Sequence, residues 1–386
     1  MAGIYIHIPF CASRCIYCGF YSTTQHDLQQ RYVDAICKEM QTRHDSAHYD
    51  TVYLGGGTPS QLPGNLLRQI FLYINKVYEV SPTAEVTIEC NPDDVTDSFA
   101  QLLAELPVNR VSMGAQTFSD DRLRFLHRRH TAKQVSMAVK NLRQAGIQNI
   151  SIDLMYGFPN ETIDQWHRDI DAALSLQVEH LSAYCLMYEE NTMLMKLKDE
   201  ENQSMRNNRT GIDNRPLRYQ PIDEETELQM YSDLIGRLTN AGFEHYEISN
   251  FARPTFRSRH NSSYWNGTPY IGLGAAAHSY DGRNRRQWNI SDIKDYITGM
   301  ESGMPVFDYE KLDADTMYNE QVMTALRTCE GLNLTTLSAT HRQYCLLQAH
   351  RFLEDHLLTL TDNRLRLTHR GLFVSNMIMS GLMKTY

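Results

Sequence analysis

The sequence predicts an α/β protein whose core is a parallel sheet of six strands. Short apolar runs rich in β-branched residues alternate with longer amphipathic stretches through the first half of the 386 residues. This alternation is typical of β-α units, in which each strand is followed by a helix that covers the sheet. In addition, polar and cysteine-rich segments follow directly after these strands, at the edge where parallel sheets bind ligands.

Six strands are expected from their short length and aliphatic composition. They span residues 4–8, 51–54, 85–89, 110–114, 149–154 and 180–184. Helical periodicity fills the intervals between the strands. The expected helices span about 28–42, 61–77, 96–105, 131–145 and 162–176.

The second half of the chain has a different pattern. Residues 196–218 are mostly charged or polar and bury too little apolar surface to offset their ordering entropy, so we expect a mobile excursion there. A helix is expected at about 224–241 with Gly242 as its C-terminal cap, followed by irregular, aromatic-rich sequence at 243–280. After Pro305 a helical pattern resumes. The expected domains are a core at 1–240, an aromatic-rich extension packed on it at 241–304, and a C-terminal domain at 305–386.

Composition and charge exclude several classes of protein. Lysine and arginine total 37 against 46 aspartates and glutamates, which gives a net charge of −9. Because no basic stripe accompanies this charge, nucleic acid is not an expected partner. The apolar runs are too short for a membrane span, and the first residues do not form a basic leader peptide. We therefore expect a globular, cytoplasmic protein.

Three of the eight cysteines lie close together after the first expected strand. A disulfide-stapled scaffold is short and dense in cysteine, unlike this chain, so the trio indicates a soft metal centre. A zinc site would need a fourth ligand, which His26 or a distant cysteine could supply. A 4Fe-4S cluster on Cys11, Cys15 and Cys18 would leave one iron open for another ligand. The other cysteines are isolated and are expected to be buried structural thiols: Cys37, Cys90, Cys185, Cys329 and Cys345.

A glycine-rich loop and several charged residues follow the other strands. Gly55-Gly56-Gly57-Thr58-Pro59 lets a backbone approach a ligand closely, although a tight turn explains the glycines equally well. Glu89 ends the third expected strand, and Gln116, Arg128 and Asp153 follow or end later ones. Each is ambiguous alone, but their joint placement indicates a single site at the carboxyl edge of the sheet.

Two sets of motifs resemble known families. The cysteine spacing, with Tyr17 before the last cysteine and a glycine-rich second loop, resembles the radical S-adenosylmethionine (radical SAM) superfamily. Further motifs cover nearly the whole chain and resemble, in order and spacing, the oxygen-independent coproporphyrinogen III oxidase group. These motifs are Tyr5-Ile-His-Ile-Pro-Phe-Cys11, Ile88-Glu-Cys-Asn-Pro92, Ser112-Met-Gly-Ala-Gln-Thr-Phe118 and Ile152-Asp-Leu-Met-Tyr-Gly-Phe-Pro159.

This resemblance implies an incomplete (β/α)6 radical SAM barrel with a small, mainly helical C-terminal domain of the HemN type. It also implies that Cys11, Cys15 and Cys18 hold a 4Fe-4S cluster, whose open iron is chelated by the amino and carboxylate groups of S-adenosylmethionine (SAM). The residues implied around one or two SAM positions are Tyr5, Tyr17, Gly56, Gly57, Thr58, Glu89, Gln116, Arg128, Asp153 and Met187.

Two departures from the oxidase point to a particular branch of this group. The oxidase has a further cysteine where this chain has Phe20, and an N-terminal extension where this chain has three residues before its first strand. Both departures are typical of the HemW branch, which is described as haem chaperones without oxidase activity. The segment His260-Asn261-Ser262-Ser263-Tyr264-Trp265 also resembles the HNxxYW motif that is associated with haem binding in that branch.

The expected haem site therefore comprises His260, Asn261, Tyr264 and Trp265. A histidine nitrogen can ligate haem iron, and aromatic rings can cover the macrocycle. Alternatively, this segment merely packs on the barrel, with His260 bonded to backbone. His278 is a second candidate ligand and is expected to face the barrel mouth.

The predicted function is that of a haem chaperone that binds haem, a 4Fe-4S cluster and SAM and transfers haem to an acceptor haemoprotein. The alternatives are an anaerobic coproporphyrinogen III oxidase, another radical SAM enzyme acting on a porphyrin, and a zinc-stabilised barrel. A low-potential electron donor such as a flavodoxin or ferredoxin is an expected partner. The sequence leaves catalytic residues and enzyme activity open, along with the acceptor, peripheral membrane association and a homodimer.

Overall fold

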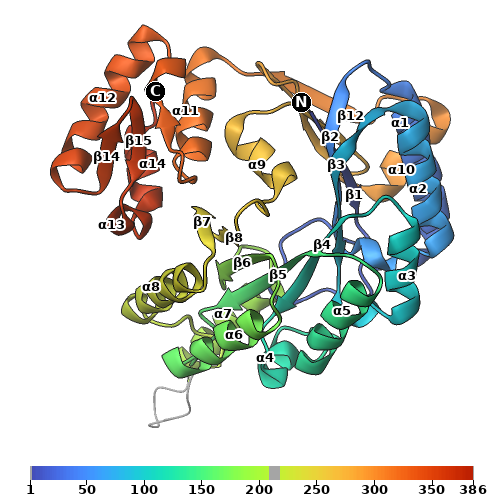
Figure 1. The fold of residues 1–386 in the computed structure, drawn as a ribbon, viewed down its shortest axis with the longest axis horizontal. Coiled ribbons are helices and arrows are strands. Elements are labelled where there is room, and N and C mark those ends of the chain that lie inside the picture. Colours follow the sequence, from blue (N-terminus) through green and yellow to red (C-terminus); the bar gives the residue numbers. More distant parts are fainter. Residues whose placement is uncertain (1, 208–217, 386) are drawn as a thin grey trace.

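The computed structural model describes residues 2–207 and 218–385, and its centre is a curved sheet wrapped by helices (Figure 1). The six predicted strands are confirmed, and they lie parallel in chain order. They are β1 (Gly3–Ile8), β2 (His48–Gly56), β3 (Glu79–Cys90), β4 (Arg110–Gln116), β5 (Asn149–Tyr156) and β6 (His180–Cys185).

The helices that connect these strands cover the outer face of the sheet (Figure 1). They are α1 (Gln29–Thr42), α2 (Gly64–Val77), α3 (Asp97–Glu105), α4 (Asp120–Phe125), α5 (Ala132–Gln144) and α6 (Ile163–Ser175). Alternate residues of each strand pack against them: Ile4, Ile6 and Ile8 of β1 are fully buried in the main apolar core. Because alternate side chains point to opposite faces, the intervening residues face the inside of the barrel.

The inner face of the sheet is polar. Register places Tyr5, Tyr53, Thr87 and Arg110 side by side on β1 to β4, so their side chains share that face. A second row, nearer the amino ends of the strands, holds Gly3, Thr51 and Glu85. The barrel interior is therefore suited to polar contacts along its whole depth.

Strands from later in the chain extend the sheet at both edges. The order is β12-β11-β10-β9-β1-β2-β3-β4-β5-β6-β8-β7, so the barrel stays open. The added strands are β7 (Glu244–Glu247), β8 (Asn250–Ala252), β9 (Tyr270–Leu273), β10 (His278–Tyr280), β11 (Arg285–Asn289) and β12 (Phe307–Lys311). The prediction of irregular structure over 243–280 is thus wrong. Its strands are too short to show a period-two pattern.

The charged segment after β6 also differs from its prediction. Residues 193–207 form helix α7 (Met193–Asn207), which is followed by α8 (Glu224–Asn240) at the predicted place. Leu194 anchors α7, since its side chain is fully buried and its N–H donates to the Ile16 carbonyl at 2.8 Å. Lysine and glutamate are good helix formers, so polarity alone did not exclude a helix. The remainder of the predicted excursion, 208–217, lies outside the described residues.

The C-terminal part has an apolar core of its own, which includes Val322, Phe352, Leu365 and Ile378. Its helices are α11 (Ala314–Ala325), α12 (Ala339–Glu354), α13 (His369–Leu372) and α14 (Ser375–Leu382). A small sheet of β13 (Leu332–Asn333), β14 (Leu358–Thr361) and β15 (Arg364–Leu367) completes it. The other helix of the main body, α10 (Ile293–Ser302), packs on α1.

Helix α9 (Arg259–Asn266) lies between the C-terminal part and the strands, near the chain's N-terminus (Figure 1). It contacts both β2 and α11. Within the described ranges, no helix combines the length and apolarity needed to cross a bilayer.

Candidate functional site

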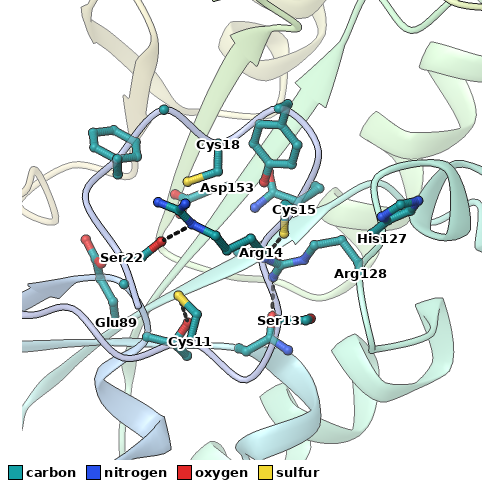
Figure 2. A pocket seen from close by; sticks show the side chains of 18 of the residues that line it. Cys11, Ser13, Arg14, Cys15, Cys18, Ser22, Glu89, His127, Arg128 and Asp153 are labelled. Atoms are coloured by element: carbon teal, nitrogen blue, oxygen red, sulfur yellow. Dashed lines mark hydrogen bonds between the residues drawn. The ribbon is translucent and has the colours of Figure 1, made fainter. Parts of the chain in front are cut away.

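The carboxyl ends of β1 to β6 surround a pocket of about 630 Å³, which we call the mouth pocket. All six strands contribute to its wall, β5 through its own residues, β1 through the loop that follows it, and the others through both. Its lining includes Cys11, Cys15, Tyr17, Cys18, Gly56, Gly57, Thr58, Glu89, Asn91, Gln116, Arg128, Asp153 and Met187. Figure 2 shows Cys11, Cys15, Cys18, Glu89, Arg128 and Asp153 converging from segments that are far apart in the sequence.

The three cysteines lie in the loop after β1, and their sulfur atoms face a common space (Figure 2). Neighbouring loops hold two of these thiols by hydrogen bonds. Cys11 Sγ is 3.5 Å from Thr58 Oγ1, and Arg128 Nη1 donates to Cys15 Sγ at 3.6 Å. Burial raises the pKa of both Cys11 and Cys18. The cysteine loop thus presents three soft ligands, and a cation from a neighbouring loop, Arg128, lies beside one of them.

The groups around the three thiols bear on the choice between a zinc ion and a cluster. Across residues 2–207 and 218–385, no three histidine, cysteine, aspartate or glutamate side chains lie close enough to hold one metal ion. His26, a candidate fourth zinc ligand, instead has its Nε2 3.2 Å from the Cys11 carbonyl and its Nδ1 3.1 Å from Gln29 Nε2. A structural zinc site needs a fourth protein ligand, and His26 does not supply it in this structure. Three thiolates with an open fourth position fit the donor set of a 4Fe-4S cluster.

The glycine-rich loop after β2 owes its composition to close packing. A Cβ at Gly57 would lie 2.7 Å from the Pro9 carbonyl group, and one at Gly56, where φ is +113°, would lie 2.5 Å from the His7 ring. The Gly57 N–H also donates to the Ile8 carbonyl at 2.9 Å. Only glycine permits this contact between the loop and the end of β1. The glycine-rich loop therefore fixes the position of residues 8 and 9, from which the cysteine loop begins.

Two half-buried carboxyl groups face the mouth pocket. Glu89 Oε1 accepts a hydrogen bond from the Tyr53 hydroxyl at 2.7 Å, and Glu89 Oε2 accepts one from the Gly56 N–H at 3.0 Å. Burial raises the pKa of Glu89 to about 6 and that of Asp153 to about 6, while the nearby charge of Arg110 opposes both shifts. Both groups are therefore mainly ionised at neutral pH, which suits a cationic ligand.

Arg128 connects three parts of the wall. Its Nη2 donates to the Gly114 carbonyl at 2.6 Å and also to Asn91 Oδ1. Gln116 ends β4 at a register shift and has a φ of +66°, which turns the chain toward the pocket. Met187 lies on the rim with 61 % of its surface exposed.

The structure brings most of the predicted residues together. All three cysteines and nine of the ten predicted SAM residues line the mouth pocket, and Tyr5 is the exception. The Tyr5 hydroxyl lies 2.9 Å from His7 Nδ1 inside the barrel. Tyr5 points inward from the middle of β1, whereas the pocket begins beyond that strand's end.

Several lining residues were missed by the sequence analysis: Arg14, Phe20, Asn91, Ser112, His127, Arg129, Tyr184 and Glu189. Asn91 and Ser112 could have been found, because they belong to motifs at the ends of expected strands. Tyr184 lies near the end of β6, another expected strand, and Phe20 was noted only as a departure from the oxidase. Arg14, His127, Arg129 and Glu189 carry no signal beyond their place in a loop. Among the isolated cysteines, Cys185 also lines the pocket and Cys329 is exposed, so neither is the buried thiol that was predicted.

The predicted haem residues lie at the opposite end of the barrel, on α9. His260 is fully buried, with Nδ1 2.8 Å from Thr51 Oγ1 and Nε2 2.9 Å from the Tyr264 hydroxyl. Burial and the charge of Arg110 lower the pKa of His260 to about 3. Both ring nitrogens are hydrogen-bonded in this structure, and the role of His260 as an axial haem ligand stays a prediction.

Two other predicted haem residues of α9 also contact protein groups. The Arg327 guanidinium lies over the Trp265 ring, 5.1 Å from the ring centroid. The Asn261 N–H donates to the hydroxyl of Ser258, the N-cap of the helix. His278 is an exposed residue of β10 and does not line the mouth pocket. Its predicted orientation is therefore wrong, because β10 belongs to the extension of the sheet beyond β1.

Two family profiles match the chain. The family described as "Radical SAM superfamily" matches residues 5–173, and the "HemN C-terminal domain" matches residues 312–374. The chain is 33% identical to "Heme chaperone HemW" of Bacillus subtilis, covering 99% of each protein. It is also 33% identical to the protein of that name from Mycobacterium tuberculosis, covering 99% of this chain and 94% of that relative.

A solved structure shares the fold over nearly the whole chain. It is that of "Coproporphyrinogen III oxidase (HemN) from Escherichia coli", with a TM-score of 0.81 and 21% identity, covering 99% of this chain and 90% of the other. At this identity the likeness confirms the barrel and the C-terminal part as a common fold, without deciding the activity.

Proposed function

The chain belongs to the radical SAM superfamily and, within it, to the family of the haem chaperone HemW, and on that premise we propose that it binds haem and passes it to an acceptor haemoprotein. The observation that carries this proposal is 33% identity to proteins named as haem chaperones along 99% of the chain. The match includes the barrel, α9 and the C-terminal part, so it is not limited to a shared cofactor motif.

Under this proposal Cys11, Cys15 and Cys18 hold a 4Fe-4S cluster in the mouth pocket. A bound cluster supplies low-potential electrons and one iron open to a further ligand. The chain's own part is to fix the three sulfurs and to stabilise their charge. Arg128 beside Cys15 and the Thr58 hydroxyl beside Cys11 support both tasks, because hydrogen bonds to thiolates tune such a centre.

We assign the carboxylates and glycines of the mouth pocket to SAM. This molecule carries an ammonium group and a sulfonium centre, both positive, and the ionised Glu89 and Asp153 complement them. Gly56 and Gly57 line the pocket, so their backbone groups are available to an amino-acid head group. Tyr17, Gln116 and Met187 complete the wall that would enclose the ligand.

A porphyrin-acting radical SAM enzyme is the second candidate. The shared fold with the Escherichia coli oxidase favours it, since the same barrel supports that chemistry there. Against it, Phe20 stands 74 % exposed in the cysteine loop, where the oxidase is expected to carry a further cysteine. A low-potential electron donor would be a partner in either case, and we place the protein in the cytoplasm.

The test is a paired measurement on anaerobically reconstituted protein. Titration with haem should give a saturable Soret band. Incubation with coproporphyrinogen III, SAM and a low-potential reductant should give no protoporphyrinogen. The Escherichia coli oxidase serves as the positive control for turnover. Sustained turnover by this chain would contradict the chaperone assignment and support the second candidate, and absence of a Soret change would contradict haem binding.

A further inference from the structure

Helix α9 carries a motif that takes no part in the mouth pocket, yet it is packed tightly against the barrel. We define the barrel floor as Gly3, Thr51, Glu85 and His260. The Glu85 carboxylate accepts hydrogen bonds from the backbone N–H groups of Arg259 and His260, each at 3.0 Å. A Cβ at Gly3 would lie 2.8 Å from Thr51 Oγ1 and 3.1 Å from the His260 ring, so the floor is shaped to admit that ring.

The His260 ring is fixed in orientation as well as in position. Its nitrogens hydrogen-bond to Thr51 and Tyr264, and the Tyr264 ring meets it edge-on at 5.3 Å between centroids. On its face, the ring stacks on Tyr53 with centroids 5.0 Å apart and planes inclined by 26°. His260 is therefore a rigid support against which the Tyr53 side chain rests.

Tyr53 transmits this support to the mouth pocket. It is nearly fully buried, and its hydroxyl donates to Glu89 Oε1 at 2.7 Å. The other Glu89 oxygen is held by the Gly56 N–H. Glu89 thus has one fixed partner on the glycine-rich loop and one on Tyr53, so a change in the position of Tyr53 would move or free its carboxylate. His260, Tyr53 and Glu89 form a column that runs from the barrel floor to the mouth pocket.

We propose that His260 is a positioning residue of the SAM site, which acts through Tyr53 to set the place of the Glu89 carboxylate. This inference rests on the proposed function, because it takes SAM as the ligand of Glu89. It gives α9 a role in cofactor binding that does not require His260 to leave its buried position. The C-terminal part supports the same helix from the other side, through Arg327 over the Trp265 ring.

The experiment compares SAM binding and haem binding in the same anaerobically reconstituted variants. SAM affinity is measured by equilibrium dialysis, and haem binding by the Soret titration. Tyr53→Phe removes one hydroxyl from the column and should weaken SAM binding by about tenfold, the usual loss for a hydrogen bond to a charged group. His260→Ala should weaken it by a similar factor, while the Soret maximum and haem affinity stay as in the unchanged protein.

Two further variants separate positioning from a general structural role. His260→Phe keeps a ring stacked on Tyr53 without any ring nitrogen, and it should retain most of the SAM affinity that His260→Ala loses. The double variant His260→Ala/Tyr53→Phe should be no weaker than the weaker single variant, since both changes act on one column. His350→Ala, at an exposed histidine of α12, is the control and should change neither measurement.

The following results would contradict the positioning role of His260. If Tyr53→Phe binds SAM as tightly as the unchanged protein, or if His260→Ala loses the Soret band but keeps its SAM affinity, the inference is wrong. If His260→Ala fails to fold, Tyr53→Phe and His260→Phe still give the decision. Failure of the unchanged protein to bind SAM would instead contradict the proposed function itself.

Discussion

The mouth pocket and the barrel floor are built on the same strands, β1 to β3, yet their polar side chains are used differently. At the mouth, Cys11 and Cys18 line an open pocket, and a neighbouring carboxylate faces the same space. At the floor, the histidine ring is enclosed and both its nitrogens are hydrogen-bonded. The difference teaches that a cysteine, histidine or carboxylate points to a ligand site when its polar atoms face open space. When those atoms are already hydrogen-bonded within the protein, the residue instead holds its neighbours in position.

The largest effect is expected from removing one cysteine of the mouth pocket. Cys15→Ser should abolish the iron-sulfur absorption and leave the circular dichroism spectrum of the barrel largely unchanged, because Cys15 lies in a loop outside the apolar core. Cys329→Ser, at an exposed cysteine, should keep the full cluster content. Equal iron and sulfide in both variants would show that the mouth cysteines are not cluster ligands.

A substitution near the barrel floor should lower stability and leave the iron content unchanged. Arg327 pairs with the Glu247 carboxylate, whose side chain is fully buried, at 2.8 Å through Nε and 2.7 Å through Nη2. Arg327→Met leaves that charge unpaired and should lower the free energy of unfolding by about 3 kcal/mol. Urea denaturation measures this loss, and iron content should not change. Loss of iron with unchanged stability would reverse the distinction between the two regions.

The glycine-rich loop tests how closely the mouth pocket is packed. Gly57→Ala places a methyl group against the Pro9 backbone, so the cysteine loop must shift, and we expect a clear loss of cluster content after reconstitution together with about 1–3 kcal/mol of stability. Gly236→Ala is the matched control. Position 236 lies in α8 with open space around its Cβ, and the change should stabilise the protein by about 0.5–1 kcal/mol. Retention of full cluster content in Gly57→Ala would contradict the packing argument.

The smallest expected effect is a pH dependence of SAM affinity. The pKa values of Glu89 and Asp153 are raised to about 6, so both carboxyls lose their charge as the pH falls through that value. Affinity should be constant above about pH 7 and decrease below about pH 6, because protonation removes the charges that attract a cation. Equilibrium dialysis across this range measures the dependence.

Arg110 provides a variant that should displace this pH curve. It is 1 % exposed, and its Nε and Nη1 have no hydrogen-bond partner among the described residues. Its charge lowers the pKa of both carboxyls, so Arg110→Met should move the loss of SAM affinity to higher pH. Arg370→Met, at an exposed arginine, should leave the curve in place. An unchanged curve in Arg110→Met would contradict this electrostatic role.

Much of the barrel could be predicted because its signals are local. The six strands and their helices follow from periodicity within short windows, and parallel topology then brings the ends of the strands together. For that reason the sequence pattern alone is enough to group Glu89, Gln116 and Asp153, which lie on three different strands. The strands of the sheet extension escaped prediction because runs such as 250–252 and 278–280 are too short to show a period.

The role of the floor could not be predicted, because it depends on contacts between distant residues. Nothing within 259–266 indicates that Thr51 and Tyr53 will meet the His260 ring, since about 200 residues separate them in the chain. The sequence pattern of a histidine followed by aromatic residues is the same whether the histidine faces a ligand or packs at the end of a barrel. Telling the two apart needs the burial of the ring, which is a property of the folded chain.

Metal analysis of protein purified without oxygen tests the central claim most directly. We expect about four iron atoms and about four acid-labile sulfides per chain, lost together in the Cys15→Ser variant. Stoichiometric zinc without sulfide, or neither iron nor sulfide in the intact protein, would contradict the assignment of the mouth pocket and the haem-chaperone proposal that includes it.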